Sequence, residues 1–125
     1  MSPGDLVDIM AEGSNRKIWK IRTIKNYPEA HNHLFIGQVL ELHQSYVRLD
    51  CRTYHFGRAI NSARDIRAGT KGIRILPWTC IELINELPSS FDYSKAELVS
   101  NKEGKIALSD GKTDCILSSS YDNRY

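Results

Sequence analysis

The chain has 125 residues, of which 41% are hydrophobic and 26% are charged, and its formal net charge is +2. This length predicts one domain with its own apolar core, or one domain with an extension. No apolar run reaches the ~18 residues of a membrane-spanning helix, so no membrane partner is expected. The nearly balanced charge gives no global argument for a nucleic-acid partner.

The cysteines indicate a reducing compartment. Cys51, Cys80 and Cys115 are odd in number and far apart, which predicts reduced and mostly buried thiols instead of a disulfide framework. The first ten residues, MSPGDLVDIM, lack the basic region and apolar stretch of a signal peptide. We therefore expect a cytoplasmic protein.

The first third of the chain gives weak structural signals. Pro3-Gly4, followed by Leu6 and Val7, predicts a turn that leads into a short strand. In residues 16–25, isoleucine recurs every three positions, as on an amphipathic helix, whereas the β-branched and aromatic content favours a strand. Both interpretations stay open, with a slight preference for the strand. Residues 26–32 are predicted to form a loop.

Residues 34–56 give the clearest signal, that of a long bent hairpin. Val47, Leu49 and Cys51 alternate with charged residues, which is typical of a strand with one wet face. Gly37 lies inside the preceding strand and indicates a bulge or a sharp bend. Residues 43–45 are the expected turn between the two strands.

A basic insert, residues 57–72, precedes the next strand. Asn61-Ser62 is positioned to cap a short helix that ends at Gly69. Residues 73–87 predict two short strands. Because proline cannot donate a ladder hydrogen bond, these strands should be separated at Pro77-Trp78 by a kink or a single turn of tight helix.

The composition changes after residue 88. We therefore predict a barrel domain over residues 1–88 and a C-terminal extension over residues 89–125, packed on the barrel or hanging from it. Within the extension we expect a short helix that starts near Asp92, and a hairpin turn at Asp110-Gly111. The polar end, residues 118–125, is predicted to be disordered.

The hairpin and the strands after the insert together resemble a known family. The segments FIGQVLELHQSYVRLDC (residues 35–51) and ILPWTCIELI (residues 75–84) are similar to the two signature segments of Sm-like (LSm) proteins. The resemblance covers about residues 34–87 and implies a mainly β fold, a small and strongly bent Sm-like or SH3-like barrel. It also implies assembly into rings by edge-to-edge strand pairing, and many such rings bind single-stranded RNA.

The chain departs from the family at both RNA-binding loops. Where the family usually has an acidic residue and an asparagine, this chain has His43, Gln44, Ser45 and Tyr46. Where the family usually has an Arg-Gly pair, this chain has Leu76-Pro77-Trp78. The 16-residue insert and the extension are also unusual. The chain can therefore share the fold of the family without sharing its RNA-binding site.

Two functions are consistent with these features. The first is a homo-oligomeric Sm-like module that binds single-stranded RNA or another single-stranded nucleic acid. Tyr46 would stack on a base, and phosphates would contact the cations of the insert and the next strand: Arg58, Arg64, Arg67, Lys71 and Arg74. The alternative is a non-catalytic structural or protein-interaction barrel. In that case the cations lie on a solvated surface that keeps the protein soluble, and Tyr46 packs against the rest of the domain. Trp78 would then fill the barrel end, or lie at a subunit interface.

No catalytic, cofactor or metal site is expected. His31 and His33 are able to reach one ion, but a third ligand is missing unless the fold brings in Cys51 or His55. Gly111-Lys112-Thr113 lacks the glycine that a phosphate-binding loop has five positions earlier. The carboxylates Asp65 and Glu82 have no sequence-near partner, so no acid–base pair is predicted.

Overall fold

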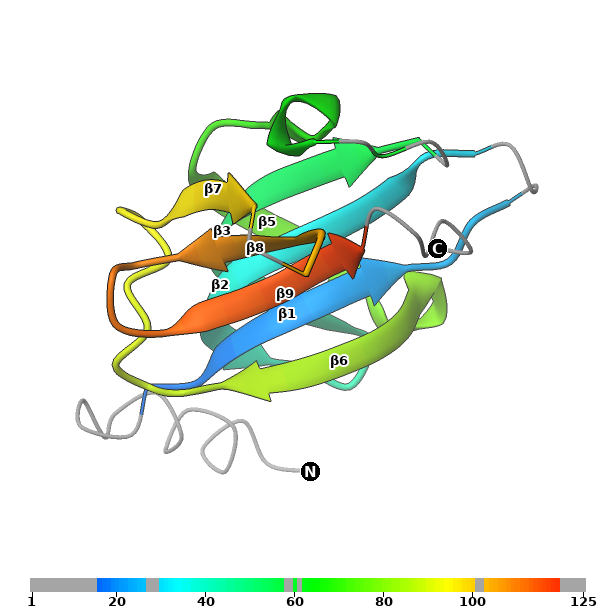
Figure 1. Ribbon diagram of the computed structural model, residues 1–125. Helices are drawn as coiled ribbons and strands as arrows, with labels where there is room; N and C mark the ends of the chain where they lie inside the picture. The colour runs from blue at the N-terminus through cyan, green and yellow to red at the C-terminus, as the bar shows by residue number, and fades with distance from the viewer. Residues whose placement is uncertain (1–15, 27–29, 58–59, 61, 101–102, 120–125) are drawn as a thin grey trace.

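The computed structural model describes residues 16–26, 30–57, 60, 62–100 and 103–119 (Figure 1). They form two antiparallel β-sheets. The larger sheet has the order β4-β3-β2-β1-β6, and β5 pairs with β3 on the same side as β4. Its strands are β1 (Ile18–Thr23), β2 (Asn32–Leu42), β3 (Tyr46–Phe56), β4 (Arg67–Ala68), β5 (Gly72–Pro77) and β6 (Ile81–Leu87).

The smaller sheet has the order β7-β8-β9 and lies across one face of the larger one (Figure 1). Its strands are β7 (Glu97–Ser100), β8 (Lys105–Ser109) and β9 (Asp114–Ser119). The protein is therefore mainly β, as the sequence predicts. Among the described residues, no helix is long and apolar enough to cross a membrane.

At Gly37 the backbone of β2 approaches β3 too closely to leave room for a side chain. Gly37 lies opposite Cys51 on β3, and a Cβ atom at this position would overlap the Asp50 carbonyl oxygen and the Cys51 backbone. The β2–β3 register also shifts between Val39 and Glu41, which adds a bulge next to the bend. Glycine is therefore required at position 37 by the close approach of β3, two residues before the bulge.

One apolar cluster is formed mainly by side chains of the larger sheet, and we call it the concave cluster. Its buried members come from four strands and are packed against half-buried side chains that include Trp19, Phe35, Trp78 and Ile84. The buried members are Ile21, Val39, Val47, Leu49, Cys51 and Leu76. Hydrogen bonds do not close the sheet into a barrel in the described part of the chain, because β5 pairs only with β3 and β6 only with β1.

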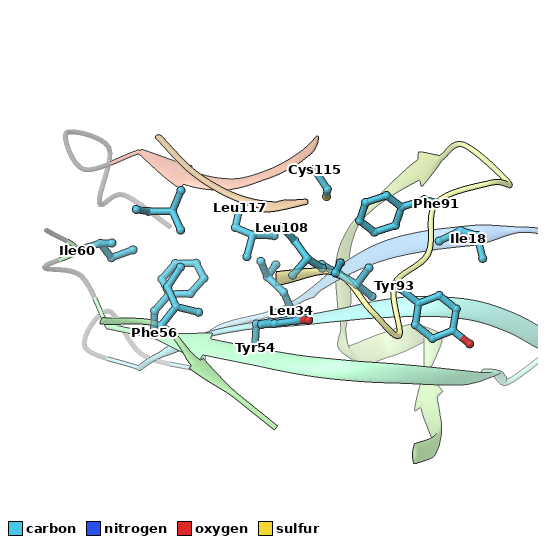
Figure 2. Packing of buried hydrophobic residues seen from close by; sticks show 14 residues of the cluster. Ile18, Leu34, Tyr54, Phe56, Ile60, Phe91, Tyr93, Leu108, Cys115 and Leu117 are labelled. Carbon is cyan, nitrogen blue, oxygen red and sulfur yellow. The ribbon is translucent and has the colours of Figure 1, made fainter. Parts of the chain in front are cut away.

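A second and larger cluster joins the two sheets (Figure 2). Leu108, Cys115 and Leu117 of the smaller sheet face Leu34 and Tyr54 of the larger one in this view. Further buried members are Ile18, Ile36, Phe56, Ile60, Ile66, Phe91, Tyr93, Ala96 and Ile106. The C-terminal segment is thus packed on the larger sheet as an integral layer.

Polar contacts also tie the smaller sheet and its connection to the larger sheet. Lys20 Nζ donates to the Ile116 carbonyl oxygen at 2.9 Å, and Arg52 donates to the Ala96 carbonyl oxygen at 2.8 Å. The Tyr93 hydroxyl donates to Asp50 Oδ2 at 2.6 Å. These hydrogen bonds fix the position of the smaller sheet on the larger one.

Four local predictions are confirmed. Residues 18–23 are a strand, and the hairpin of residues 34–56 corresponds to β2 and β3. The interruption after β5 is a single 3-10 turn, η3 (Trp78–Cys80). Asp110-Gly111 makes the turn between β8 and β9, where Asp110 Oδ1 accepts from the backbone N–H groups of Lys112 and Thr113. This explains residues 111–113 as a turn and not as part of a phosphate loop.

Two predicted helices are wrong. In the insert, Ser62 caps only one 3-10 turn, η2 (Ala63–Asp65), because Ile66 is then drawn into the core and residues 67–68 pair with β3. The segment near Asp92 is a turn, in which the Ser94 hydroxyl donates to Asp92 Oδ1. The strand expected near Leu6 and the last part of the tail, residues 120–125, lie outside the described residues.

Candidate functional site

Tyr46 begins β3 at one end of the curved sheet. Its ring stacks on the His43 ring, with 4.4 Å between centroids and 10° between planes. The Tyr46 hydroxyl is 3.5 Å from Glu41 Oε1, which is the limit of a hydrogen bond. Tyr46 therefore presents one ring face to His43 and is held mainly by stacking.

Trp78 joins the same end of the sheet from η3. Its indole N–H donates to the His43 carbonyl oxygen at 2.7 Å, and its backbone N–H donates to the Ser45 carbonyl oxygen at 3.2 Å. The fold thus brings the turn at residues 43–45 and η3 to the same end of the sheet. We call the set of His43, Tyr46 and Trp78 the aromatic end.

Lys71, predicted to contact phosphate, is instead bound to the protein's own carboxylate. Its Nζ lies 2.9 Å from Asp50 Oδ2, which also accepts from the Tyr93 hydroxyl. Burial opposes the charge of Asp50, but the hydrogen bonds from Tyr93 and Lys71 outweigh it and hold the pKa of Asp50 below its ordinary value. Burial and this carboxylate raise the pKa of Tyr93.

Arg74, on β5, is half-buried on the concave side of the sheet. One guanidinium nitrogen donates to the Thr70 carbonyl oxygen at 3.3 Å, while Nε is buried without a hydrogen-bond partner. The guanidinium also neighbours the Cys51 thiol, but burial outweighs it and raises the pKa of Cys51 to about 11. Cys51 is consequently a neutral thiol at pH 7 and not an activated nucleophile.

The other two thiols are equally unsuited to nucleophilic chemistry. Burial raises the pKa of Cys115 and of Cys80, and neither thiol forms a disulfide. Cys115 is buried, as predicted, whereas Cys80 is only half-buried, because η3 leaves it at the edge of the concave cluster.

The remaining predicted cations lie far from Tyr46. Arg64 is exposed on η2, and Arg67 is exposed on β4 opposite His55, near the end of β3. Tyr46 is at the start of the same strand, opposite Pro77. The insert therefore does not form one continuous surface with Tyr46. Arg58 lies outside the described residues.

At that far end of β3 the fold brings His55, and not Cys51, to His31 and His33, which settles an alternative that the sequence left open. His33 and His55 are direct cross-strand partners, with ring centroids 5.5 Å apart and planes at 22°. His31 stacks on His55 at 6.2 Å and 25°. The spacing of His31 and His33 by two residues was the only local signal, because the pairing with His55 depends on the β2–β3 register.

The histidine cluster (His31, His33 and His55) does not form a metal centre as it stands. Within the described residues, no three histidine, cysteine or acidic side chains are placed to hold an ion. The third histidine that a site would need is present, but its ring is stacked with the other two. Burial, followed by the charges of His55 and His31, lowers the pKa of His33.

No protein-family model, curated protein or solved structure matches the chain.

Proposed function

We propose that the chain is a homo-oligomeric Sm-like module that assembles by strand pairing and binds single-stranded nucleic acid at its aromatic end. The observation that carries the proposal is the strand order β6-β1-β2-β3-β5, with a register shift in β2 after Val39 and one 3-10 turn between β5 and β6. The Sm-like resemblance implies a small, strongly bent barrel, and this strand order is compatible with one.

The outer edges of β5 and β6 support assembly. Each of these strands pairs on one side only in the described part of the chain, which leaves backbone donors and acceptors open for another strand. Ile73 and Ile75 on β5 are 57% and 56% exposed, and Leu83 on β6 is 44% exposed. Pairing of β5 with β6 of the next copy joins two different surfaces, so repetition gives a ring if the rotation closes.

The aromatic end supports binding of a single strand. A base can stack on any aromatic face, and such stacking contributes ~1–3 kcal/mol per base. His43, Tyr46 and Trp78 come from the two segments that, by resemblance, carry the RNA loops. Single-stranded RNA is therefore the ligand we propose for this end.

The cations favour a second candidate, a structural or protein-interaction barrel. Lys71 pairs with Asp50 and Arg74 is half-buried, so neither is free to contact phosphate without losing a bond inside the protein. A module without nucleic-acid affinity would use the open edges of β5 and β6 for protein partners alone.

Fluorescence anisotropy of a labelled oligouridine separates these candidates. Binding should weaken steeply as salt rises, because phosphate contacts release counterions. Tyr46→Ala should weaken binding about tenfold, since a lost stacking contact of ~1.4 kcal/mol corresponds to that factor. The control Arg64→Gln, at the opposite end, should have a smaller effect. No binding by the wild type at low salt would overturn the nucleic-acid part of the proposal and leave the protein-interaction candidate.

A further inference from the structure

The two outer strands of the larger sheet carry few charges, and these are of opposite sign. The single charged residue of β5 is a cation, Arg74. The two charged residues of β6 are carboxylates, Glu82 and Glu86. Glu82 lies 3.6 Å from Arg22 and is already paired within the chain. Glu86 is exposed and takes part in no ion pair among the residues that the structure describes. One edge therefore offers a free carboxylate and the other a cation.

Arg74 has no acidic partner in the described part of its own chain. Its guanidinium donates to the Thr70 carbonyl oxygen, but at 3.3 Å, and its Nε is buried without a hydrogen-bond partner. A guanidinium has five N–H donors, and a half-buried cation without a carboxylate is unfavourable because it has lost part of its hydration. A carboxylate from another molecule would therefore stabilise Arg74.

Arg74 and Glu86 lie on the same face of the larger sheet. Arg74 is the cross-strand partner of Leu49, a buried member of the concave cluster. Glu86 is the cross-strand partner of Trp19, which packs against the same cluster. Residues that are directly paired on neighbouring strands point to one face, so both charged side chains are on the side of the concave cluster. If β5 of one copy extends the sheet of the next copy at β6, the two charges meet on that side.

One antiparallel alignment of β5 with β6 of the next copy matches both the charged and the apolar residues. When Arg74 is opposite Glu86, Leu76 is opposite Ile84, and both of these belong to or pack against the concave cluster. A shift of two residues in one direction places Arg74 opposite Ile84, and in the other direction it places Arg74 beyond the end of β6. A shift of one residue turns the concave face of one strand to the opposite side.

We propose that Arg74 of one copy forms an ion pair with Glu86 of the next copy, and that this pair selects the register in which β5 and β6 join. The inference rests on the proposed assembly through these two edges. Backbone hydrogen bonds alone do not distinguish one register from another, whereas a charge pair directly across two strands favours one alignment and disfavours like charges in it. Each copy then contributes a cation on one side and a carboxylate on the other, as head-to-tail assembly requires.

Charge reversal tests the pair in the full chain. Size-exclusion chromatography with light scattering, over a range of protein concentrations, would compare the wild type with Arg74→Glu, with Glu86→Arg and with their equimolar mixture. Each variant alone places like charges at every contact and should need at least about tenfold more protein to assemble, a factor that corresponds to ~1.4 kcal/mol. The mixture should assemble as the wild type does, because alternating copies meet at one original and one reversed pair. Glu97→Arg, an exposed charge reversal on β7, is the matched control and should assemble normally.

The outcomes separate this pair from the assembly itself. If the wild type assembles and Glu86→Arg does so at the same concentration, the ion pair is overturned while the proposed assembly stands. The ion pair is also overturned if the two variants, each shown by urea unfolding to be folded, stay apart when mixed. Because Glu86 is exposed, Glu86→Arg should keep the wild-type unfolding free energy, so its result counts whether or not Arg74→Glu folds. A wild type that is monomeric at every concentration would contradict the assembly and, with it, the pair.

Discussion

The centre and the flanks of the larger sheet use apolar side chains in different ways. At the centre, Leu34 and Ile36 are fully buried because the smaller sheet covers them. On the flanking strand β5, Ile73 and Ile75 remain more than half exposed. The smaller sheet thus completes the core over β1, β2 and β3 and leaves the outer strands uncovered. The centre thus supplies the core, and the exposed side chains of the flanks are the ones that we propose for association.

The largest expected effect is at the covered centre. Phe91 is 0% exposed in the cluster between the sheets. Phe91→Ala should lower the free energy of unfolding by about 3–5 kcal/mol, because it removes apolar contacts and leaves a cavity. Urea unfolding measures this. Val99→Ala, at an exposed position of β7, should change the same quantity by less than about 0.5 kcal/mol. A similarly small effect at Phe91 would mean that the smaller sheet is not part of the core.

A second and smaller effect is expected at the bend. Gly37→Ala should cost about 1–3 kcal/mol, since the new Cβ meets the backbone of β3 and forces the strands apart. Gly72→Ala is the matched control, because a Cβ there meets nothing within 4 Å. Equal unfolding free energies for the two variants would show that the curvature does not require glycine at position 37.

These two positions also show how far the sequence predicts the fold. Gly37 could be recognised, because a glycine among alternating apolar residues marks a bend wherever it occurs. The role of Phe91 could not, because the segment around it has no regular period and its partners, such as Ile18 and Leu108, are distant in sequence. The candidate sites also differ in whether a local sequence signal or a contact between distant residues forms them. Tyr46 was found beside a predicted turn, whereas the contact of His55 with His33 exists only through the β2–β3 register.

The smallest expected effect on stability concerns pH, at the uncovered end of β3. The pKa of His33 is lower in the folded protein than its ordinary value, so the unfolded chain binds more protons between the two values. The stability that the neutral ring contributes is therefore complete above about pH 6.5 and is lost as the pH falls through the folded pKa. Unfolding free energies measured between about pH 5 and pH 7 should fall on acidification.

His33→Gln should flatten this dependence, and His43→Gln serves as its control. A pH dependence of the unfolding free energy that is unchanged from the wild type in His33→Gln would disprove the assignment to His33. This comparison also tells whether the histidine cluster, unlike the covered centre, makes stability depend on pH.

The most direct test of the central claim, that the open edges of β5 and β6 assemble the chain, is the solution mass from size-exclusion chromatography with light scattering. The wild type should elute as a multiple of its 14.2 kDa chain mass. Ile75→Lys should reduce it to the monomer with little change in unfolding free energy, whereas Val99→Lys, on the smaller sheet, should stay assembled. A wild-type monomer, or an oligomer that persists in Ile75→Lys as fully as in Val99→Lys, would contradict assembly through β5.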